Sequence, residues 1–504
     1  MNDPVLWTTV LVLGPLVGAL VALEGRSWMI RLGLALGAGA SLWGSAGLWG
    51  SVARTGPIRH LLGGWGAPLG IELHADGLSV AMLAVTAVVG TGVSLYSTSY
   101  FGHPARLLTR HTLHTSPAQR GARFFAPLWL LLWTALNGIY LSGDLFNLYV
   151  TLEILGLSAA AIVTLAVTSQ ATAAGMRYLI VSLVGSLLFL AGVALLYTTY
   201  GTLSVAGLAA ISPSGTLPAV ALAAMTVGLA VKTALFPFHG WLPPAHASAP
   251  APASALLSGL VVKGSFYVIL RLWVDVYGGG TRLGLLMLGL LGATAILWGS
   301  ILALRQVSLK RLVAYSTVAQ LGYLFVMFPL LVPEAGEWSE AAWGGGLYHA
   351  LSHAVAKAAM FLAAGSITYA VARDALPSMT GLVHRLPVSF FAFGVAGLSL
   401  AGLPPSGGFV AKWLMLRSAA ASGQWGWALV IAAGGILTVG YVLLVLRYGL
   451  GRSEPGSTFR TVPRRMEWTA LGLALLAVLM GIWPTEILAL LGGDGSAPLG
   501  TMHR

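Results

Sequence analysis

Long apolar stretches separated by short polar ones are the main pattern of this chain. Apolar runs of about 20 residues or more recur from residue 4 to residue 491, and each is long enough to cross the membrane as a helix. We count about 14 such spans, beginning near residues 4, 29, 76, 123, 145, 176, 217, 248, 284, 307, 342, 387, 425 and 467. The pattern predicts an all-α polytopic membrane protein.

The composition agrees with this class and excludes several others. Only 8% of the residues are charged and the mean hydropathy is +0.84, whereas an ordinary soluble domain has roughly 25% charged residues. The chain has no cysteine, which excludes disulfides, thiolate metal ligands and cysteine-held iron–sulfur clusters. It also lacks a G-x-x-x-x-G-K-[ST] phosphate loop. We therefore expect no cofactor, and energy that comes from an ion gradient or from another subunit.

The arginines and lysines predict the orientation. If the N-terminus is outside, the inner loops hold 17 of the 27 basic residues, the outer segments hold four and the spans hold six. Positive charge in short loops marks the cytoplasmic side of a membrane protein. The formal charge of +12 is then explained by loops near anionic lipid, without a nucleic-acid partner. The basic inner loop at 101–123 is expected to be solvated or to dock a neighbouring subunit.

The lysines are the exceptional charges. Four of the five, Lys232, Lys263, Lys357 and Lys412, lie inside apolar stretches, whereas most of the 22 arginines lie between them. An ammonium group held away from water can lose its proton near neutral pH, whereas a guanidinium group effectively cannot. A row of lysines at membrane depth therefore predicts a proton pathway.

One carboxylate, Glu153, lies well within a predicted helix, and Asp144 marks the entrance of that helix. A carboxylate at this depth needs a cation, and the candidates are Lys232 and Arg177. At a separation of about 4 Å and an effective dielectric constant near 20, such a pair attracts by roughly 4 kcal/mol. The pair is either a structural ion pair or a titrating switch, whose opening favours release of the lysine proton.

Two proline-rich segments predict broken helices. Pro237, Pro243 and Pro244 follow Lys232, and Pro404 and Pro405 precede Lys412. Unpaired backbone at membrane depth is tolerated where it is buried in protein or lines a wet cavity. Paired broken helices are also typical of inverted repeats around a central pathway, here about 123 to 274 and 284 to 449.

Histidines accompany both regions. His239 and His246 occupy the first break, where they either relay protons or act as hydrogen-bonding caps. His349, His353 and Lys357 follow one another at four-residue intervals and so share one helical face. No carboxylate or third histidine lies near this face in sequence, and we expect no metal site.

Hydroxyl groups could complete the pathway. Tyr315 and Ser316 are candidates to hold a file of water, or else to hydrogen-bond between helices. The economical arrangement is a polar axis in the membrane plane, which connects Glu153, Lys232, Lys263, His349, His353, Lys357 and Lys412.

Several motifs resemble the antiporter-like subunits shared by respiratory complex I, membrane-bound hydrogenases and multisubunit Mrp cation/proton antiporters. The motifs include GDLFNLYVTLEIL, K-x-x-x-F-P-x-H-x-W-L-P-x-A-H, L-V-A-Y-S-T-V-A-Q-L-G-Y, H-x-x-x-H-x-x-x-K and G-L-P-P-x-x-G-F, and the match covers about residues 75 to 450. The stretch around Glu153 looks most like the D subunit of Mrp antiporters. The short tail after the last span looks like that of the middle-sized relatives.

The resemblance implies a fold of 14 helices with two inverted five-helix repeats. It divides the chain into N-terminal helices at 1–122, repeats at 123–274 and 284–449, and a C-terminal loop and helix at 450–504. It also implies that Glu153 and Lys232 form a switching pair, that Lys263 is a central relay, that the two histidines connect, and that Lys412 is the terminal proton site.

Three functions follow from these features. The first is a proton-translocating subunit of a multisubunit cation/proton antiporter in the cell inner membrane, with sodium as the exchanged cation and other membrane subunits as partners. The second is a proton-pumping membrane subunit of a redox complex, either an NADH-quinone oxidoreductase or a membrane-bound hydrogenase. In both, no catalytic chemistry is expected in this chain alone. A passive channel or an assembly scaffold is the third, and it would need no titrating row.

Overall fold

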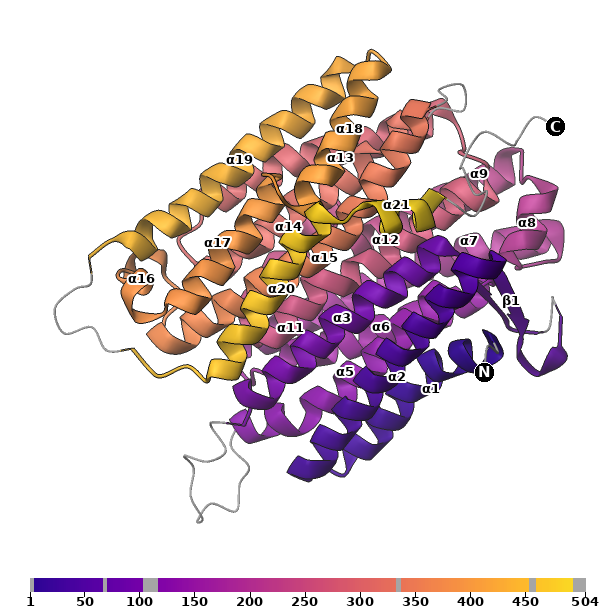
Figure 1. The fold of residues 1–504 in the computed structure, drawn as a ribbon. Coiled ribbons are helices and arrows are strands. Elements are labelled where there is room, and N and C mark those ends of the chain that lie inside the picture. Colours follow the sequence, from indigo (N-terminus) through magenta and orange to yellow (C-terminus); the bar gives the residue numbers. More distant parts are fainter. Residues whose placement is uncertain (1–3, 67–69, 103–116, 332–336, 453–458, 493–504) are drawn as a thin grey trace.

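The computed structural model describes residues 4–66, 70–102, 117–331, 337–452 and 459–492. Most of these residues are helical, and the helices lie side by side in one elongated bundle (Figure 1). The elements up to residue 276 are α1 (Pro4–Leu23), α2 (Ser27–Thr55), β1 (Ile58–Leu61), η1 (Leu62–Gly64), β2 (Glu72–Ala75), α3 (Gly77–Tyr100), α5 (Pro117–Leu141), α6 (Leu145–Thr164), α7 (Ser169–Tyr200), α8 (Val205–Ile211), α9 (Thr216–Thr233), η2 (Phe238–Trp241), α10 (Leu242–Ser248), α11 (Ala251–Leu256), η3 (Leu257–Val261), α12 (Val262–Arg271) and η4 (Leu272–Val276).

The second part of the bundle begins at residue 282. Its elements are α13 (Arg282–Leu304), α14 (Leu309–Val326), η5 (Phe328–Leu330), α15 (Glu337–Val371), η6 (Leu376–Ser378), α16 (Leu382–Arg385), α17 (Pro387–Ala401), α18 (Gly407–Ala421), α19 (Trp425–Leu450), α20 (Arg464–Ile482) and α21 (Thr485–Gly492). Residues 103–116, which include Arg106, Arg110, His111 and His114 of the predicted docking loop, lie outside the described residues.

The predicted class, an all-α polytopic membrane protein, is confirmed. Twelve helices of the described residues are long and apolar enough to cross a membrane. Two further predicted spans, near residues 29 and 387, correspond to α2 and α17. The α2 helix is continuous, but its sequence contains many glycines and serines among the apolar residues. The α17 helix has only 15 residues. The total of about 14 spans, the inverted symmetry of the repeats and the domain division stay predictions.

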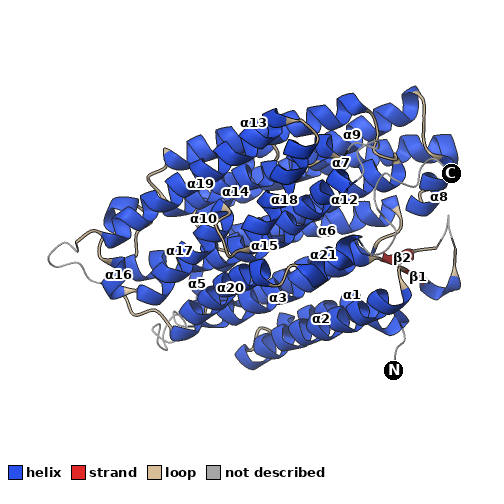
Figure 2. Ribbon diagram, turned by 45° about the horizontal axis from the view of Figure 1, so that its top comes forward, coloured by secondary structure: helices blue, strands red, loops and turns tan. Residues whose placement is uncertain are grey.

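A small antiparallel sheet marks one end of the bundle. Strands β1 and β2 pair with Ile58 opposite Ala75 and Leu61 opposite Glu72. Figure 2 shows this sheet in red, close to α8 and to the N-terminal end of the chain. Thr8 on α1 is hydrogen-bonded to His60 on β1 at 3.1 Å, which fixes the start of α1 beside the sheet. We call this end of the bundle the hairpin end.

Polar caps fix where the site-bearing helices begin. The Asp144 carboxylate accepts hydrogen bonds from the backbone N–H groups of Phe146 and Asn147, and so caps α6. Ser308 caps α14 and Ser406 caps α18 in the same way. These side chains satisfy N–H groups that have no partner within the helix. The registers of Glu153 on α6 and Lys412 on α18 follow from these starts.

Both predicted helix breaks are present. α9 ends at Thr233, one residue after Lys232, and the chain resumes as the 3-10 turn η2 and as α10. α17 ends at Ala401, and α18 begins at Gly407, five residues before Lys412. Each break leaves helix-end carbonyl groups that need donors. At the first break, the Trp241 indole N–H donates to the carbonyl of Val231 at 3.0 Å.

The centre of the bundle is formed by α12 and α15. The membrane-spanning segment that includes α12, Ala251–Val276, is buried at every residue except Asp275. α15 packs against α14, α17, α18 and α20. In contrast, more than half of the residues in the most apolar parts of α7, α19 and α20 are half-buried or exposed. The central helices carry Lys263, His349, His353 and Lys357.

Candidate functional site

Lys232 and Glu153 form the predicted ion pair. The Lys232 ammonium on α9 lies 3.6 Å from Glu153 Oε1 on α6, and the two side chains are 6% and 19% exposed. The ammonium also donates to Ser182 Oγ at 2.9 Å and to the carbonyl of Leu152 at 3.3 Å. Arg177, the other candidate cation, is exposed on α7. The position of Lys232 at the end of α9 places its charge beside the negative end of that helix.

Lys263 follows a π-helical turn in the centre of the bundle. It is fully buried, and its ammonium donates to the carbonyl of Ser258 in η3 at 2.5 Å. Such turns widen a helix locally and are frequent at functional sites. The Ser258 hydroxyl lies 2.8 Å from that of Thr317 on α14. Between α9 and α12 the polar connection is a hydrogen bond from Thr233 to Ser265, at 2.9 Å.

The two histidines of α15 lie on one face, as the spacing predicted. The rings of His349 and His353 stack with centroids 5.6 Å apart and planes at 5°, and each residue is 1% exposed. His349 Nε2 lies 3.1 Å from the carbonyl oxygen of Gln320. Neither ring nitrogen of His353 has a hydrogen-bond partner within the described part of the chain. His353 lies one turn before Lys357 on α15.

Lys357 lies one turn further along the same face. Its ammonium donates to the carbonyl of Val313 at 2.8 Å and to the hydroxyl of Ser316. Its nitrogen is also 5.8 Å from the centre of the Phe361 ring, and His246 stacks on this ring at 4.8 Å. The structure therefore brings Ser316 and His246 to Lys357. Tyr315 is only half-buried and packs at the edge of the core.

Lys412 lies just after the second break. Its ammonium donates to the carbonyls of Leu400 and Ala401, the last residues of α17, at 2.6 and 3.3 Å. It also lies 4.3 Å above the centre of the Tyr323 ring, which is 5.1 Å from the ring of His349. A cation at the carbonyl end of a helix is favoured by the helix dipole, and an aromatic face adds to this.

Two predicted supporting residues lie apart from this row. Asp144 is the cap of α6, and burial raises the pKa of its carboxyl group. His239 is half-buried in η2 and stacks on Phe236 at 5.5 Å. Among the described residues, no group of three or more histidine, aspartate or glutamate side chains is placed to hold a metal ion.

Sequence reasoning missed two residues that organise the site. Lys310, the one lysine outside the group of four, lies in the first turn of α14 and donates to the carbonyls of Ala247 and Ala249 at the end of α10, at 3.2 and 2.5 Å. The signal was the proline-rich break itself, whose carbonyls require a donor. Gln320 donates to Thr438 at 3.1 Å, while its backbone carbonyl contacts His349. A buried amide in an apolar helix indicates such a role.

The fold and these contacts define the class of protein. The chain is a polytopic membrane protein with buried lysines and histidines on its central helices and beside two helix breaks. A family model described as "NADH:quinone oxidoreductase/Mrp antiporter, TM" matches residues 142–439, more than half of the chain. The chain belongs to this family.

Similar proteins include subunits of redox complexes and subunits of cation/proton antiporters. The chain is 33% identical to the N subunit of an NADH-quinone oxidoreductase from Desulforudis audaxviator, over 87% of each chain. It is 29% identical to the D subunit of a Na(+)/H(+) antiporter from Alkalihalophilus pseudofirmus, over 77% of this chain and 75% of that one. A chain of the solved Mrp complex from Dietzia sp. superposes with a TM-score of 0.87 and 26% identity, and the alignment covers 98% of both chains.

Proposed function

We propose that this chain is the proton-translocating, antiporter-like subunit of a multisubunit cation/proton antiporter, with sodium as the exchanged cation. The relatives named as antiporter subunits and the likeness to a chain of the Mrp complex support this function. The proposed proton pathway consists of Glu153, Lys232, Lys263, His349, His353, Lys357 and Lys412. No catalytic chemistry is assigned to the chain alone.

One observation carries the proposal: the positive charges of the four buried lysines have different kinds of partner. The Lys232 ammonium has a carboxylate partner at 3.6 Å, whereas Lys263, Lys357 and Lys412 contact carbonyl or hydroxyl oxygens. At an effective dielectric constant near 20, this separation corresponds to an attraction of about 5 kcal/mol. Opening the pair removes this attraction from a desolvated ammonium, which favours transfer of its proton to the next amine. Closing the pair favours reloading.

The histidines supply the step between the lysines. A neutral imidazole has one nitrogen that donates and one that accepts, so it can receive a proton at one side and release one at the other. His353 meets this requirement because its two buried nitrogens are not held by other described groups. Its stacking on His349 and its position one turn before Lys357 on α15 support this step.

The surroundings of the subunit follow from its surface and charges. We place it in the cell membrane as a multi-pass protein with an outside N-terminus, because 17 of the 27 basic residues then fall in inner loops. Other membrane subunits are its partners, and α7, α19 and α20 offer apolar faces to them or to lipid. Protons and sodium are its transported partners, and no nucleic acid is involved.

Transport by the reconstituted complex tests the proposal. Vesicles that contain the complete complex receive a sodium gradient, and an internal pH dye reports proton movement. Replacing Lys263 with alanine should abolish exchange while the complex still assembles, because the central relay is lost. Arg305→Gln, which removes an exposed charge at the end of α13, is the control. Undiminished exchange by an assembled Lys263→Ala complex would falsify the pathway.

A redox complex is the second candidate, because the relative at 33% identity is named as a subunit of NADH-quinone oxidoreductase. The same row of amines would then be driven by electron transfer in other chains. Purification of the native complex distinguishes the two functions. Co-purifying chains that carry redox clusters support the redox complex, and only small membrane chains support the antiporter.

A further inference from the structure

α12 carries a second polar row, perpendicular to the proposed pathway. Lys263, Tyr267 and Arg271 follow one another at four-residue intervals, and Asp275 continues the series in η4. Residues spaced in this way share one helical face. A helix rises about 1.5 Å per residue, so Arg271 lies roughly 12 Å beyond Lys263 along the axis. The row leads from the central amine toward the hairpin end of the bundle.

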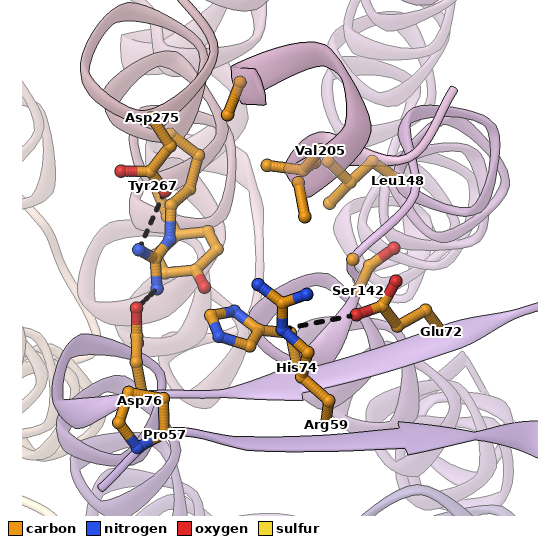
Figure 3. A pocket seen from close by; sticks show the side chains of 14 residues that line it. Pro57, Arg59, Glu72, His74, Asp76, Ser142, Leu148, Val205, Tyr267 and Asp275 are labelled. Carbon is orange, nitrogen blue, oxygen red and sulfur yellow. Dashed lines mark hydrogen bonds and ion pairs between the residues drawn. The ribbon is translucent and has the colours of Figure 1, made fainter. Parts of the chain in front are cut away.

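A pocket of about 210 Å³ opens at that end, between the sheet, the start of α6, α8 and the end of α12. Figure 3 shows its two sides: Tyr267, Asp76 and Asp275 lie together on one of them, and Arg59 and Glu72 lie on the other. Tyr267 and Arg271 form the part of the pocket wall that belongs to α12. The polar row therefore stands directly between Lys263 and this pocket.

Arg271 is held between two carboxylates. One side of its guanidinium forms an ion pair with Asp76, and Nη1 lies 2.9 Å from Asp275 Oδ2. Arg271 is 9% exposed and Asp76 is 4% exposed, so this part of the cluster is shielded from water. The guanidinium also lies 5.0 Å from the centre of the Tyr267 ring. The side chain is thus fixed from three directions.

The hydrogen bonds behind Arg271 run in one direction. Arg271 Nη2 donates to Ser79 Oγ at 3.2 Å, and Ser79 and Tyr267 are bonded through their hydroxyls at 3.0 Å. The Tyr267 hydroxyl donates its hydrogen to the carbonyl of Tyr140 at 3.0 Å. Ser79 therefore donates to Tyr267. This series of hydrogen bonds begins at a guanidinium group, which does not release its protons. It ends at a backbone carbonyl group, which does not accept a proton for transfer.

We propose that Arg271, Asp76, Asp275 and Tyr267 form a proton seal that isolates Lys263 from the pocket at the hairpin end. The guanidinium stays protonated and is held in place by two carboxylates, so it does not pass a proton on between the pocket and Lys263. Protons that reach Lys263 then continue along the lysine row and do not leave directly toward the hairpin side. The inference deepens the proposed function, because a leak at this point would uncouple proton flow from exchange.

The test uses the complete complex in vesicles with an imposed pH gradient, no exchangeable cation, and potassium with valinomycin to clamp the voltage. The test variant is Arg271→Gln/Asp76→Asn, which removes the buried pair together and takes the Arg271 contact from Asp275, whose side chain is 29% exposed. The matched control is Arg59→Gln/Glu72→Gln, which removes a pair at 3.7 Å from the same pocket, where the arginine side chain is 63% exposed. We expect a proton leak at least tenfold above that of the native complex in the test variant, and a native leak in the control.

A third variant identifies the route of the leak. Lys263→Ala added to Arg271→Gln/Asp76→Asn should return the leak to the native level, because the leak passes through the central amine. Equal leaks in the native and test complexes would overturn the seal. Loss of exchange without any leak would also overturn it, since Arg271 would then be part of a conduit.

Labelling gives an independent measurement if the double variant does not assemble. The chain contains no cysteine, so each introduced thiol is a unique reporter. A membrane-impermeant thiol reagent added at the hairpin side should modify Ser142→Cys in the pocket wall but not Ser258→Cys beside Lys263. Equal labelling of both would overturn the seal. A native complex without exchange, together with a leaking double variant, would refute the proposed function and leave the seal intact.

Discussion

The two halves of the bundle hold their buried cations in different ways. In the part of the chain that the structure describes, all five ion pairs lie before residue 276, and they include Lys232 with Glu153 and Arg271 with Asp76. In the second half, Lys357 and Lys412 contact carbonyl oxygens, a hydroxyl group and aromatic rings. Apart from Lys263, which donates to the carbonyl of Ser258, the buried cations of the first half are balanced by opposite charges, whereas Lys357 and Lys412 of the second half are balanced by dipoles.

The difference teaches how each site responds to the loss of a partner. Removing one member of a buried ion pair leaves an uncompensated charge, which typically costs about 3–5 kcal/mol. Removing an amine that contacts carbonyl groups leaves neutral acceptors, whose cost is about 1–3 kcal/mol. A site with dipolar partners can also lose its proton without exposing a counter-charge. The second half is thus suited to accept and release protons, and the first half to control when they are supplied.

The largest expected effect separates the two terminal lysines. Lys232→Met and Lys412→Met should both abolish exchange, because each interrupts the row. Lys232→Met should also destabilise the complex by about 3–5 kcal/mol, because Glu153 is left without its cation, whereas Lys412→Met should cost about 1–3 kcal/mol. Exchange in vesicles and the thermal midpoint of the purified complex measure the two effects.

A double variant is the control for this prediction. Lys232→Met/Glu153→Gln removes both charges and should recover most of the lost stability, but not exchange. If the thermal midpoint stays as low as in Lys232→Met alone, the destabilisation arises from packing and the contrast between the halves is wrong.

The second prediction concerns Glu153→Gln, a substitution that gives Lys232 neutral partners like those of Lys412. In Glu153→Gln, the Lys232 ammonium keeps Ser182 Oγ and the carbonyl of Leu152 as neutral acceptors, much like the partners of Lys412. Exchange should fall by about 10- to 100-fold, since about 1.4 kcal/mol corresponds to a factor of ten and the pair supplies more than that. The amount of assembled complex should not change. Loss of assembled complex instead would assign Glu153 a structural role.

Local signals in the sequence predicted a large part of this architecture. The breaks after Lys232 and before Lys412 follow from prolines that lack an N–H group, and the pair of Glu153 with Lys232 follows from the scarcity of deep carboxylates. The stacked histidines follow from their four-residue spacing. Each of these depends on one segment or on one obvious partner.

Contacts between distant segments could not be predicted in this way. Lys310 contacts carbonyl groups more than 60 residues earlier in the chain, and the residues around it do not indicate these partners. His239 and His246 lie in one motif, yet the fold leaves the first half-buried and brings only the second to Phe361. The π-helical turn beside Lys263 has no signature in hydropathy. These features depend on how helices pack, which a single sequence does not specify.

The third prediction concerns the pH dependence of the stability that the ion pair of Asp76 with Arg271 contributes in the first half of the bundle. Burial raises the pKa of the Asp76 carboxyl group, but Arg271, His74 and the backbone N–H of Ser79 together outweigh burial and lower this pKa from 3.8 to about 2. A lowered pKa in the folded state adds stability that is fully present above the unfolded value and is lost as the pH falls through the folded one. The contribution of about 2 kcal/mol should therefore be constant above about pH 4 and disappear between about pH 4 and 2. Thermal midpoints of native and Asp76→Asn complexes should converge over that range, and parallel curves would contradict the prediction.

The smallest expected effect concerns the partners of Lys412 in the second half of the bundle. Tyr323 contributes a ring face to the Lys412 ammonium at 4.3 Å and donates its hydroxyl hydrogen to the carbonyl of Ile431 at 3.3 Å. Tyr323→Phe keeps the ring, whereas Tyr323→Leu removes it. A desolvated cation–π contact stabilises the charged amine by about 1 kcal/mol, so Tyr323→Leu should change the exchange rate about fivefold relative to Tyr323→Phe. Equal rates in the two variants would mean that the carbonyls of Leu400 and Ala401 alone hold the charge. In that case the second half would depend on backbone dipoles at the helix break, and any residue that keeps α17 ended at Ala401 would matter more than the aromatic ring.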